Sequence, residues 1–249
     1  MSDRYTPDDD DDDISFDELD LDAADAVFDR GAGIAELAAQ QRAWRFGHVI
    51  VDEAQDLTPM QWRMVVRRAR GNSMTIVGDL AQRSTGAPGE WREHLPSSIT
   101  DFGYRELTTN YRSPAEVNEL AASILAELAP KLTRSTAIRR TGVAPRSLRV
   151  PSIETALPDL VAEEQNNVGD GKVAVIAQTP LDPVAPAQLL TPRAAKGLEF
   201  DSVIVVEPSA IVAEPHGLSL LYVAVTRTTR RLTIMHTADL PPVLARSLS

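Results

Sequence analysis

The sequence predicts an α/β protein built on parallel sheets. Short apolar runs alternate with amphipathic stretches between residues 48 and 235. Two of these runs end abruptly in acidic residues, and the 43% hydrophobic content of the 249-residue chain is enough for a packed core. Strands that alternate with helices are typical of layered domains with parallel sheets.

The elements are expected in the following order. Strands are predicted at residues 48–51, 74–77, 104–108, 148–150, 173–176, 188–190, 203–206 and 232–235. Helices are predicted at residues 32–45, 59–70, 113–128, 153–166 and 217–226. Pro59 suits a first helical turn and Ser113 suits an N-cap. Residues 130–146 are expected to form a surface connection, 179–186 a proline-containing loop, and the residues after Asp239 a loosely held tail.

The net charge of −11 is concentrated at the N-terminus. Residues 1–30 hold 13 acidic residues against Arg4 and Arg30, and the remaining 219 residues hold 23 acidic and 23 basic ones. Six consecutive aspartates, residues 8–13, repel one another, so residues 1–13 are expected to be disordered. Residues 14–28 fit either a short amphipathic helix or a solvated linker.

Several classes of protein are excluded by composition. No run approaches the roughly 18 apolar residues of a membrane-spanning helix, and no apolar signal region follows Met1. The absence of cysteine excludes disulfides and a thiol nucleophile, and the four histidines show no ligand spacing. We therefore expect a cytoplasmic protein without a membrane partner.

The first chemical motif is the string Val-Ile-Val-Asp-Glu-Ala-Gln-Asp at residues 49–56. An apolar strand that ends in Asp52 and Glu53 places both carboxylates at the carboxyl edge of a parallel sheet, where ligands bind. One carboxylate can hold Mg²⁺, and the next can activate a water that attacks a phosphoryl group. On these two residues alone, a solvated acidic turn is the competing interpretation.

The second motif, at residues 75–82, is a strand followed by Gly78, Asp79 and, three positions later, Gln82. The glycine permits close approach of the backbone. By itself such a string is most often an ordinary turn. Arg63, Arg67 and Arg70 share one helical face, which could contact phosphate or simply be solvated.

Three further strings complete an ordered set: Asn-Tyr-Arg-Ser-Pro at 110–114, Ala-Lys-Gly-Leu-Glu-Phe-Asp at 195–201 and Leu-Tyr-Val-Ala-Val-Thr-Arg at 221–227. With these five motifs the chain resembles superfamily 1 helicase-like ATPases of the UvrD/Rep/PcrA type. The resemblance implies RecA-like motor domains. Residues 31–103 would form the C-terminal part of the first and 104–238 the second, with an arm at 1–30 and a tail at 239–249.

The resemblance also implies ATP and Mg²⁺ as cofactors and a role for each matching residue. Asp52 would be the Mg²⁺ ligand, Glu53 the base, Gln82 the γ-phosphate sensor, Asp79 a coupling residue, Tyr111 the adenine contact, Arg112 and Arg227 the arginine fingers, and Gly197 and Glu199 part of the ribose-binding motif. Fingers from one domain that face a phosphate held by another would tie hydrolysis to closure.

One part of the family pattern does not occur in this sequence. The phosphate-binding loop Gly-x-x-x-x-Gly-Lys-Thr/Ser is not found, and in the family it lies well upstream of the Asp-Glu motif. We therefore expect the C-terminal part of a larger protein, or a gene remnant, that is inactive alone and needs an N-terminal motor segment as its partner.

Three departures refine the resemblance. The 84 positions from Arg112 to Lys196 leave no room for the large inserted subdomain, residues 83–86 lack the base-stacking aromatics, and Arg193 stands where the family has histidine. These features look most like HelD-type proteins, which bind RNA polymerase and release it from nucleic acid.

Three functions stay open: an ATPase motor fragment acting on RNA polymerase or nucleic acid, a non-enzymatic module whose acidic arm mimics nucleic acid, and an ordinary DNA helicase fragment.

Overall fold

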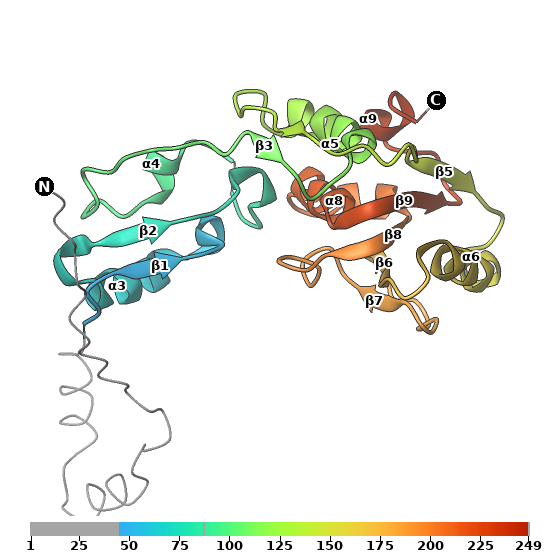
Figure 1. Ribbon diagram of the computed structural model, residues 1–249, viewed down its shortest axis with the longest axis horizontal. Coiled ribbons are helices and arrows are strands. Elements are labelled where there is room, and N and C mark those ends of the chain that lie inside the picture. Colours follow the sequence, from blue (N-terminus) through green and yellow to red (C-terminus); the bar gives the residue numbers. More distant parts are fainter. Residues whose placement is uncertain (1–44, 87, 249) are drawn as a thin grey trace, which may run out of the picture. The chain divides into compact units, whose positions relative to one another are not determined.

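The computed structural model describes residues 45–86 and 88–248. The chain divides into two units, Met1–Phe46 and Gly47–Ser249. The predicted arm at 1–30 and the predicted helix at 32–45 lie outside the described residues. Within the second unit every strand pairing is parallel, and helices separate most of the strands (Figure 1). The predicted α/β class with parallel sheets is confirmed.

The largest sheet has five strands in the order β5-β9-β8-β6-β7. Their bounds are β5 (Arg146–Arg149), β6 (Val173–Ala177), β7 (Gln188–Leu190), β8 (Phe200–Val206) and β9 (Thr228–His236). β6 is buried along its whole length and β8 nearly so, as expected for central strands that read as continuous apolar runs.

Helices cover both faces of this sheet. They are α5 (Ala115–Leu128), α6 (Ile153–Val168), α7 (Pro208–Val212), α8 (Gly217–Thr226) and α9 (Pro242–Ala245). Val203 and Val205 of β8 share a core with α5, α7, α8 and α9, whereas Ile204 and Val206 pack with α6. This alternation follows from the two-residue period of a strand. No helix in the described part is long and apolar enough to cross a membrane.

A buried ion cluster joins α6 to three strands of this sheet. Glu164 is fully buried and accepts hydrogen bonds from Arg146 Nη2, Arg231 Nε and Ser202 Oγ, each at 2.8 Å. Burial by itself would raise the pKa of Glu164. The hydrogen bonds from Arg231 and Ser202, with the charges of both arginines, outweigh burial and hold the pKa below its usual value.

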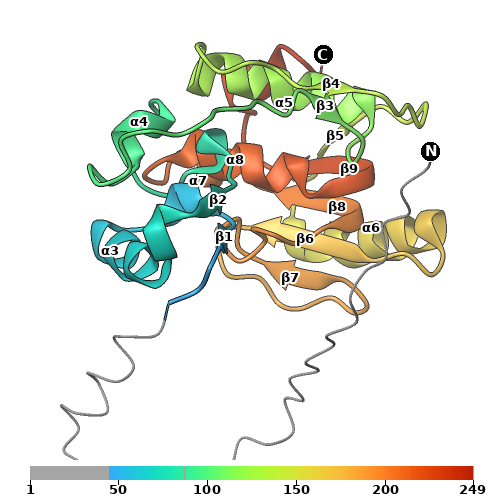
Figure 2. The same cartoon turned by 60° about the vertical axis from the view of Figure 1, so that its left-hand side comes forward.

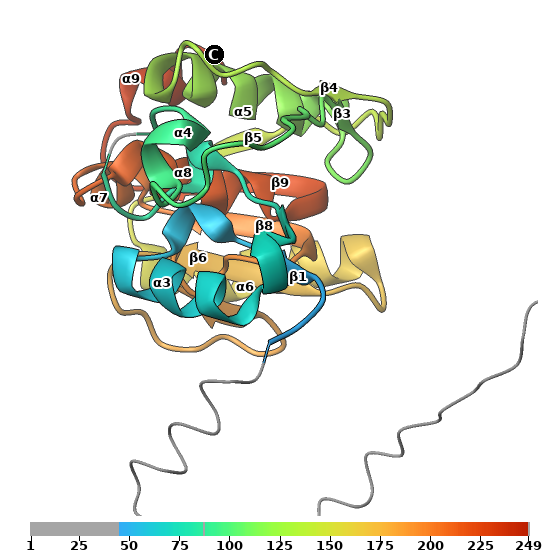
Figure 3. The same ribbon diagram turned by 90° about the vertical axis from the view of Figure 1, so that its left-hand side faces the viewer.

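A smaller sheet precedes the large one. β1 (Val49–Val51) pairs with β2 (Met74–Ile76), and α3 (Pro59–Arg68) lies beside β1 (Figure 3). Trp62 of α3 packs against Val51 and Ala54. Thr58 and Gln61 cap α3 with reciprocal hydrogen bonds, which explains why this helix begins at Pro59. A short helix, α4 (Trp91–His94), follows.

The third sheet corrects one predicted strand. The pairing consists of β3 (Thr109–Asn110) and β4 (Thr136–Ala137), so β4 lies inside the predicted surface connection. The strand predicted at 104–108 is wrong, because these residues are exposed and no core covers them.

Two further predictions are wrong for physical reasons. Ser113 is buried and does not cap α5, whose N-cap is Pro114. The backbone N–H of Ser113 donates to Asn110 Oδ1 at 3.1 Å, so Asn110 holds this turn. The residues after Asp239 are not loosely held, because α9 places Val243 and Leu244 in the main core.

Candidate active site

The first motif ends in a strained turn. We call residues 47–103 the first segment and residues 104–248 the second segment. Glu53 follows β1 with φ 50° and ψ 34°, a left-handed conformation that non-glycine residues rarely adopt, and its backbone N–H donates to Asp52 Oδ1 at 2.8 Å. Such strain is concentrated at functional sites.

Gln55 joins the two motifs of the first segment. Its side chain is almost fully buried, and its Nε2 donates to Glu53 Oε2 at 2.6 Å. Its Oε1 accepts the backbone N–H of Asp79 at 3.1 Å. The residue therefore fixes one carboxylate oxygen of Glu53 against the end of β2. Gln55 belongs to the first motif, but its position in the sequence predicted no role for it.

Gly78 lies against this contact. A Cβ atom here would lie 2.3 Å from Gln55 Oε1, 2.9 Å from the Trp91 ring and 3.2 Å from the Ala54 nitrogen. The predicted close approach at this glycine is confirmed.

Substituting Gly78 by alanine is expected to lower the free energy of unfolding by about 1–3 kcal/mol, the usual cost of overpacking a tight site. Chemical denaturation measures this change. Gly103→Ala is the matched control, because nothing lies within 4 Å of that position. Equal losses in the two variants would show that the close approach at Gly78 is not the cause.

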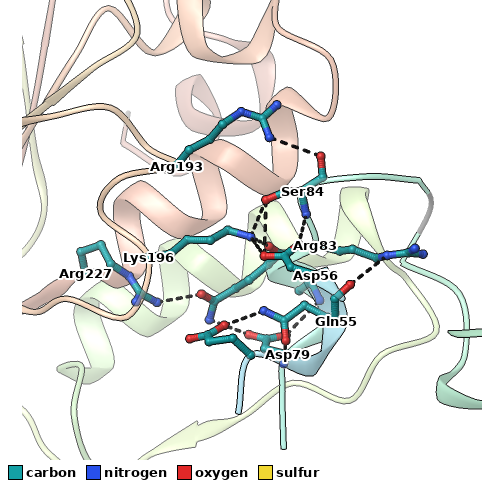
Figure 4. A network of polar contacts seen from close by, with 11 residues as sticks. Gln55, Asp56, Asp79, Arg83, Ser84, Arg193, Lys196 and Arg227 are labelled. Atoms are coloured by element: carbon teal, nitrogen blue, oxygen red, sulfur yellow. Dashed lines mark hydrogen bonds and ion pairs between the residues drawn. The ribbon is translucent and has the colours of Figure 1, made fainter. Parts of the chain in front are cut away.

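A hydrogen-bonded chain connects the second motif to the second segment. Asp79 Oδ2 accepts from Gln82 Nε2 at 2.9 Å, and Gln82 Oε1 accepts from Arg227 Nη2 at 3.0 Å (Figure 4). Arg227 is only 3% exposed. Burial lowers the pKa of its guanidinium and the charge of Arg112 lowers it further, while Glu53 and Asp79 oppose both effects.

Lys196 makes the closest contacts between the two segments. Its Nζ donates to Asp56 Oδ2 at 2.5 Å, to Ser84 Oγ at 2.7 Å and to the carbonyl oxygen of Gln82 (Figure 4). Arg193 Nη1 donates to the carbonyl oxygen of Ser84 at 3.4 Å. Asp56 and Lys196 also belong to the motifs, and the sequence predicted no role for them. The only sign that they belong to the site is that Asp56 lies three residues after Glu53 and Lys196 directly precedes Gly197.

The other predicted site residues are exposed. Asp52 directly follows β1, and the second segment holds Tyr111, Arg112, Gly197 and Glu199. Arg112 Nε pairs with Glu199 Oε2 at 2.9 Å, and both side chains are about half exposed. Tyr111 is 74% exposed, and Gly197 has a left-handed φ of 72°. Glu53, Asp79, Gln82 and Arg227 thus form one polar cluster through Gln55, whereas no hydrogen bond or ion pair joins Tyr111 or Gly197 to it in the described residues.

The donor set fits a magnesium nucleotide only in part. Asp52 offers one exposed carboxylate, and the described residues contain no group of three or more potential metal ligands. Mg²⁺ is usually held by one or two carboxylates, waters and the phosphates of its substrate. One carboxylate at this position is therefore compatible with Mg²⁺ that arrives with a nucleotide.

Two stretches of the chain match models of known families. Residues 8–83 match the UvrD/REP helicase N-terminal domain, and residues 186–235 match the UvrD-like helicase C-terminal domain. These two stretches of the chain are therefore similar to UvrD-like helicase domains. The two UvrD-like matches include all residues of the polar cluster, and the N-terminal match begins inside the acidic stretch.

Individual relatives of these UvrD-like domains are distant. DNA helicase II of Haemophilus influenzae is 29% identical over 102 residues, which are 40% of this chain and 14% of that protein. The C-terminal domain of a possible DNA helicase from Lactobacillus plantarum WCFS1 is 23% identical, with 55% of this chain and 94% of that chain covered and a TM-score of 0.40. The Arterivirus nonstructural protein 10 helicase is 19% identical, with 83% and 42% covered and a TM-score of 0.48.

Proposed function

We propose that this chain supplies the water-activating carboxylate and the arginine fingers of a superfamily 1 ATPase motor. The first segment would belong to one RecA-like domain, extending over residues 31–103, and residues 104–238 would form the other. The observation that carries the proposal is the hydrogen bond from Arg227 to Gln82, because it joins motifs 145 positions apart at one polar cluster.

The first segment provides the base. Gln55 holds Glu53 Oε2, and Glu53 Oε1 has no hydrogen bond in the described part of the chain. That oxygen can therefore accept a proton from a water. Asp52, one residue before, would hold Mg²⁺, and Mg²⁺ and ATP together supply the phosphoryl group and the divalent charge.

The second segment provides positive charge. Burial lowers the pKa of Arg227, and the positive charge of Arg112 lowers it further. Two positive guanidinium groups that repel each other favour binding of an anion between them. Phosphate oxygens are suitable anionic groups because they accept hydrogen bonds from guanidinium N–H groups. Arg112 would leave Glu199 to reach a phosphate, which frees Glu199 for ribose, and exposed Tyr111 offers a ring for adenine.

An upstream segment that carries the phosphate-binding loop would be the partner of this chain. Phosphate release is measured for the chain alone and after an upstream segment of its parent gene is added in cis or in trans. We expect no turnover for the chain alone and Mg²⁺-dependent turnover with the added segment. Turnover by the chain alone, or none with the added segment, would contradict the proposal.

The target of the motor is proposed to be an RNA polymerase complex, as in HelD-type proteins, and the missing aromatics after Gln82 favour this over unwinding of DNA. A second candidate function, a non-enzymatic module, is favoured by the net charge of −11 within residues 1–30. In that case the acidic arm would occupy a basic channel of the polymerase. A pull-down in which deletion of residues 1–30 leaves polymerase binding intact, at low and moderate salt, would exclude the second function.

A further inference from the structure

Two neighbouring strands of the large sheet send the chain to opposite faces. β5 and β9 pair in parallel, and Figure 2 shows the strands in order from β5 at the top to β7 at the bottom. After β5 the chain continues into α6, which packs on one face, and after β9 it continues into α9, which packs on the other. Where neighbouring parallel strands part in this way, a crevice forms outside their carboxyl ends, and ligands bind there.

A cavity open to solvent lies at this position, and we call it the edge cavity. Its volume is about 380 Å³, at the lower end of the range for small-molecule sites. Arg149 is the last residue of β5 and His236 the last of β9, and the two are partners in the parallel register. The lining consists of Arg149, His236, Asp239, Leu240, Ala245 and Leu248.

The edge cavity lies at the other end of the sheet from the candidate active site. Arg227 directly precedes β9 and Glu199 directly precedes β8, so both belong to the amino ends of their strands. β9 is nine residues long and ends at His236. The lining residues lie outside all five motifs. The proposed motor function therefore leaves this cavity without a role.

His236 fixes the shape of the edge cavity. Its side chain is almost fully buried, and its Nδ1 lies 2.7 Å from the carbonyl oxygen of Ala238. A carbonyl oxygen only accepts, so Nδ1 carries a proton and donates. In the neutral ring Nε2 then accepts the hydroxyl of Ser147, whose Oγ is 2.9 Å away. These two contacts hold the turn that leads to Asp239, so the cavity is already formed without a ligand.

Two opposite charges line the edge cavity. Arg149 Nη1 lies 3.1 Å from Asp239 Oδ1, and the two side chains are 64% and 90% exposed. An exposed pair of this kind contributes little to stability, so a ligand can share it at little cost. Asp239 is the one ion-pair partner of Arg149 among residues 45–86 and 88–248. Since a guanidinium has five N–H donors, Arg149 keeps donors for a carboxylate, while Asp239 suits an ammonium group.

The rest of the lining is apolar. Leu240 and Leu248 pack partly against the main core, which fixes their positions. Their remaining surface lines the edge cavity together with Ala245 of α9. An apolar group bound there would displace water from these side chains, which favours binding. The cavity thus offers one positive group, one negative group and an apolar wall.

We infer that the edge cavity binds a free α-amino acid with an apolar side chain. The ligand carboxylate would accept N–H groups of Arg149, and the ligand ammonium group would donate to Asp239. Its side chain would pack on Leu240 and Leu248. Both charges of an α-amino acid are attached to one carbon, so they are adjacent, as are those of Arg149 and Asp239. A ligand with a carboxylate alone would be repelled by Asp239, and one with an amine alone by Arg149. The inference goes beyond the proposed motor function and does not depend on it.

The test titrates the full chain, with labelled methyl groups and without nucleotide, and follows binding by two-dimensional NMR. L-Leucine should shift the methyl signals of Leu240, Ala245 and Leu248. 4-Methylpentanoate lacks only the ammonium group of leucine, and 3-methylbutylamine lacks only its carboxylate. Each should bind more weakly on the order of tenfold, because one charge-assisted hydrogen bond is lost. Glycine, which keeps both charges without the apolar group, should also bind more weakly.

Two substitutions place the site. Arg149→Gln removes the positive charge, and Ala245→Leu fills the cavity, so each should lower the affinity for leucine on the order of tenfold. The matched control is Arg246→Gln, because Arg246 directly follows Ala245 and pairs with Glu127 in another exposed ion pair, but does not line the cavity. It should leave the affinity unchanged.

Four results would overturn the inference. They are no binding of leucine, shifts confined to other methyl groups, equal affinity for leucine and 4-methylpentanoate, and an equal loss in Arg149→Gln and Arg246→Gln. Since no ATP is present and no motif residue is changed, a failure here is distinct from a failure of the ATPase assay.

Discussion

Replacing Glu164 by alanine is expected to lower the free energy of unfolding by about 3–5 kcal/mol, as measured by urea denaturation at neutral pH. The substitution leaves Arg146 and Arg231 without the carboxylate that both contact at 2.8 Å. Removing one member of a fully buried ion pair costs this much. Because the side chains of Arg146 and Arg231 are 38% and 22% exposed, water solvates part of the remaining charge, and the lower end of this range is expected. Glu164→Gln, which keeps the size of the side chain, should show the same direction with a smaller loss.

The neighbouring Glu163→Ala is the control for this prediction. Glu163 also pairs with Arg146, at 2.9 Å, but its side chain is half exposed. Its removal should cost no more than about 1 kcal/mol. Similar losses in Glu163→Ala and Glu164→Ala would show that burial of the cluster is not what matters.

The lowered pKa of Glu164 sets the pH dependence of this stabilisation. A carboxyl whose pKa is lower in the folded state contributes stability above its unfolded pKa, and this contribution is lost as the pH falls through the folded pKa. Stability of the wild-type protein should therefore decline more steeply on acidification than that of Glu164→Gln. Parallel acid limbs for the two proteins would contradict this origin of the stabilisation.

The sequence was most informative where local pattern and burial agree. β7 and α8 have the predicted bounds, and β6 and β8 were identified by continuous apolar runs that only a doubly covered sheet can bury. The sequence failed where a contact distant along the chain decides the structure. α9 is ordered by its packing into the core beside α5, which is such a contact. The N-cap predicted at Ser113 failed for a local reason, because the Ser113 backbone N–H donates to Asn110 Oδ1.

The candidate site shows the same division. The ordered motifs identified Glu53, Asp79, Gln82 and Arg227, which the structure brings together in one cluster. Spacing alone could not show that Lys196 pairs with Asp56, 140 positions away, or that Arg112 pairs with Glu199. The roles of Asp52, Tyr111, Arg112, Gly197 and Glu199 toward ATP and Mg²⁺ stay predictions.

The substitution with the largest expected effect on activity is Glu53→Gln. Glutamine keeps the size of the side chain but cannot accept a proton from the attacking water. General-base catalysis contributes about 10²–10⁴-fold to such reactions, so turnover should fall by about that factor. Glu154→Gln is the control, because Glu154 lies exposed at the start of α6.

The central claim is tested most directly by Mg²⁺-dependent ATP turnover of the chain joined to an upstream segment that carries a phosphate-binding loop. The wild-type and Glu154→Gln proteins should turn over equally, and Glu53→Gln should bind nucleotide with little change while hydrolysis is nearly abolished. Unchanged turnover in Glu53→Gln would contradict the assignment of the base and, with it, the proposed role of the polar cluster.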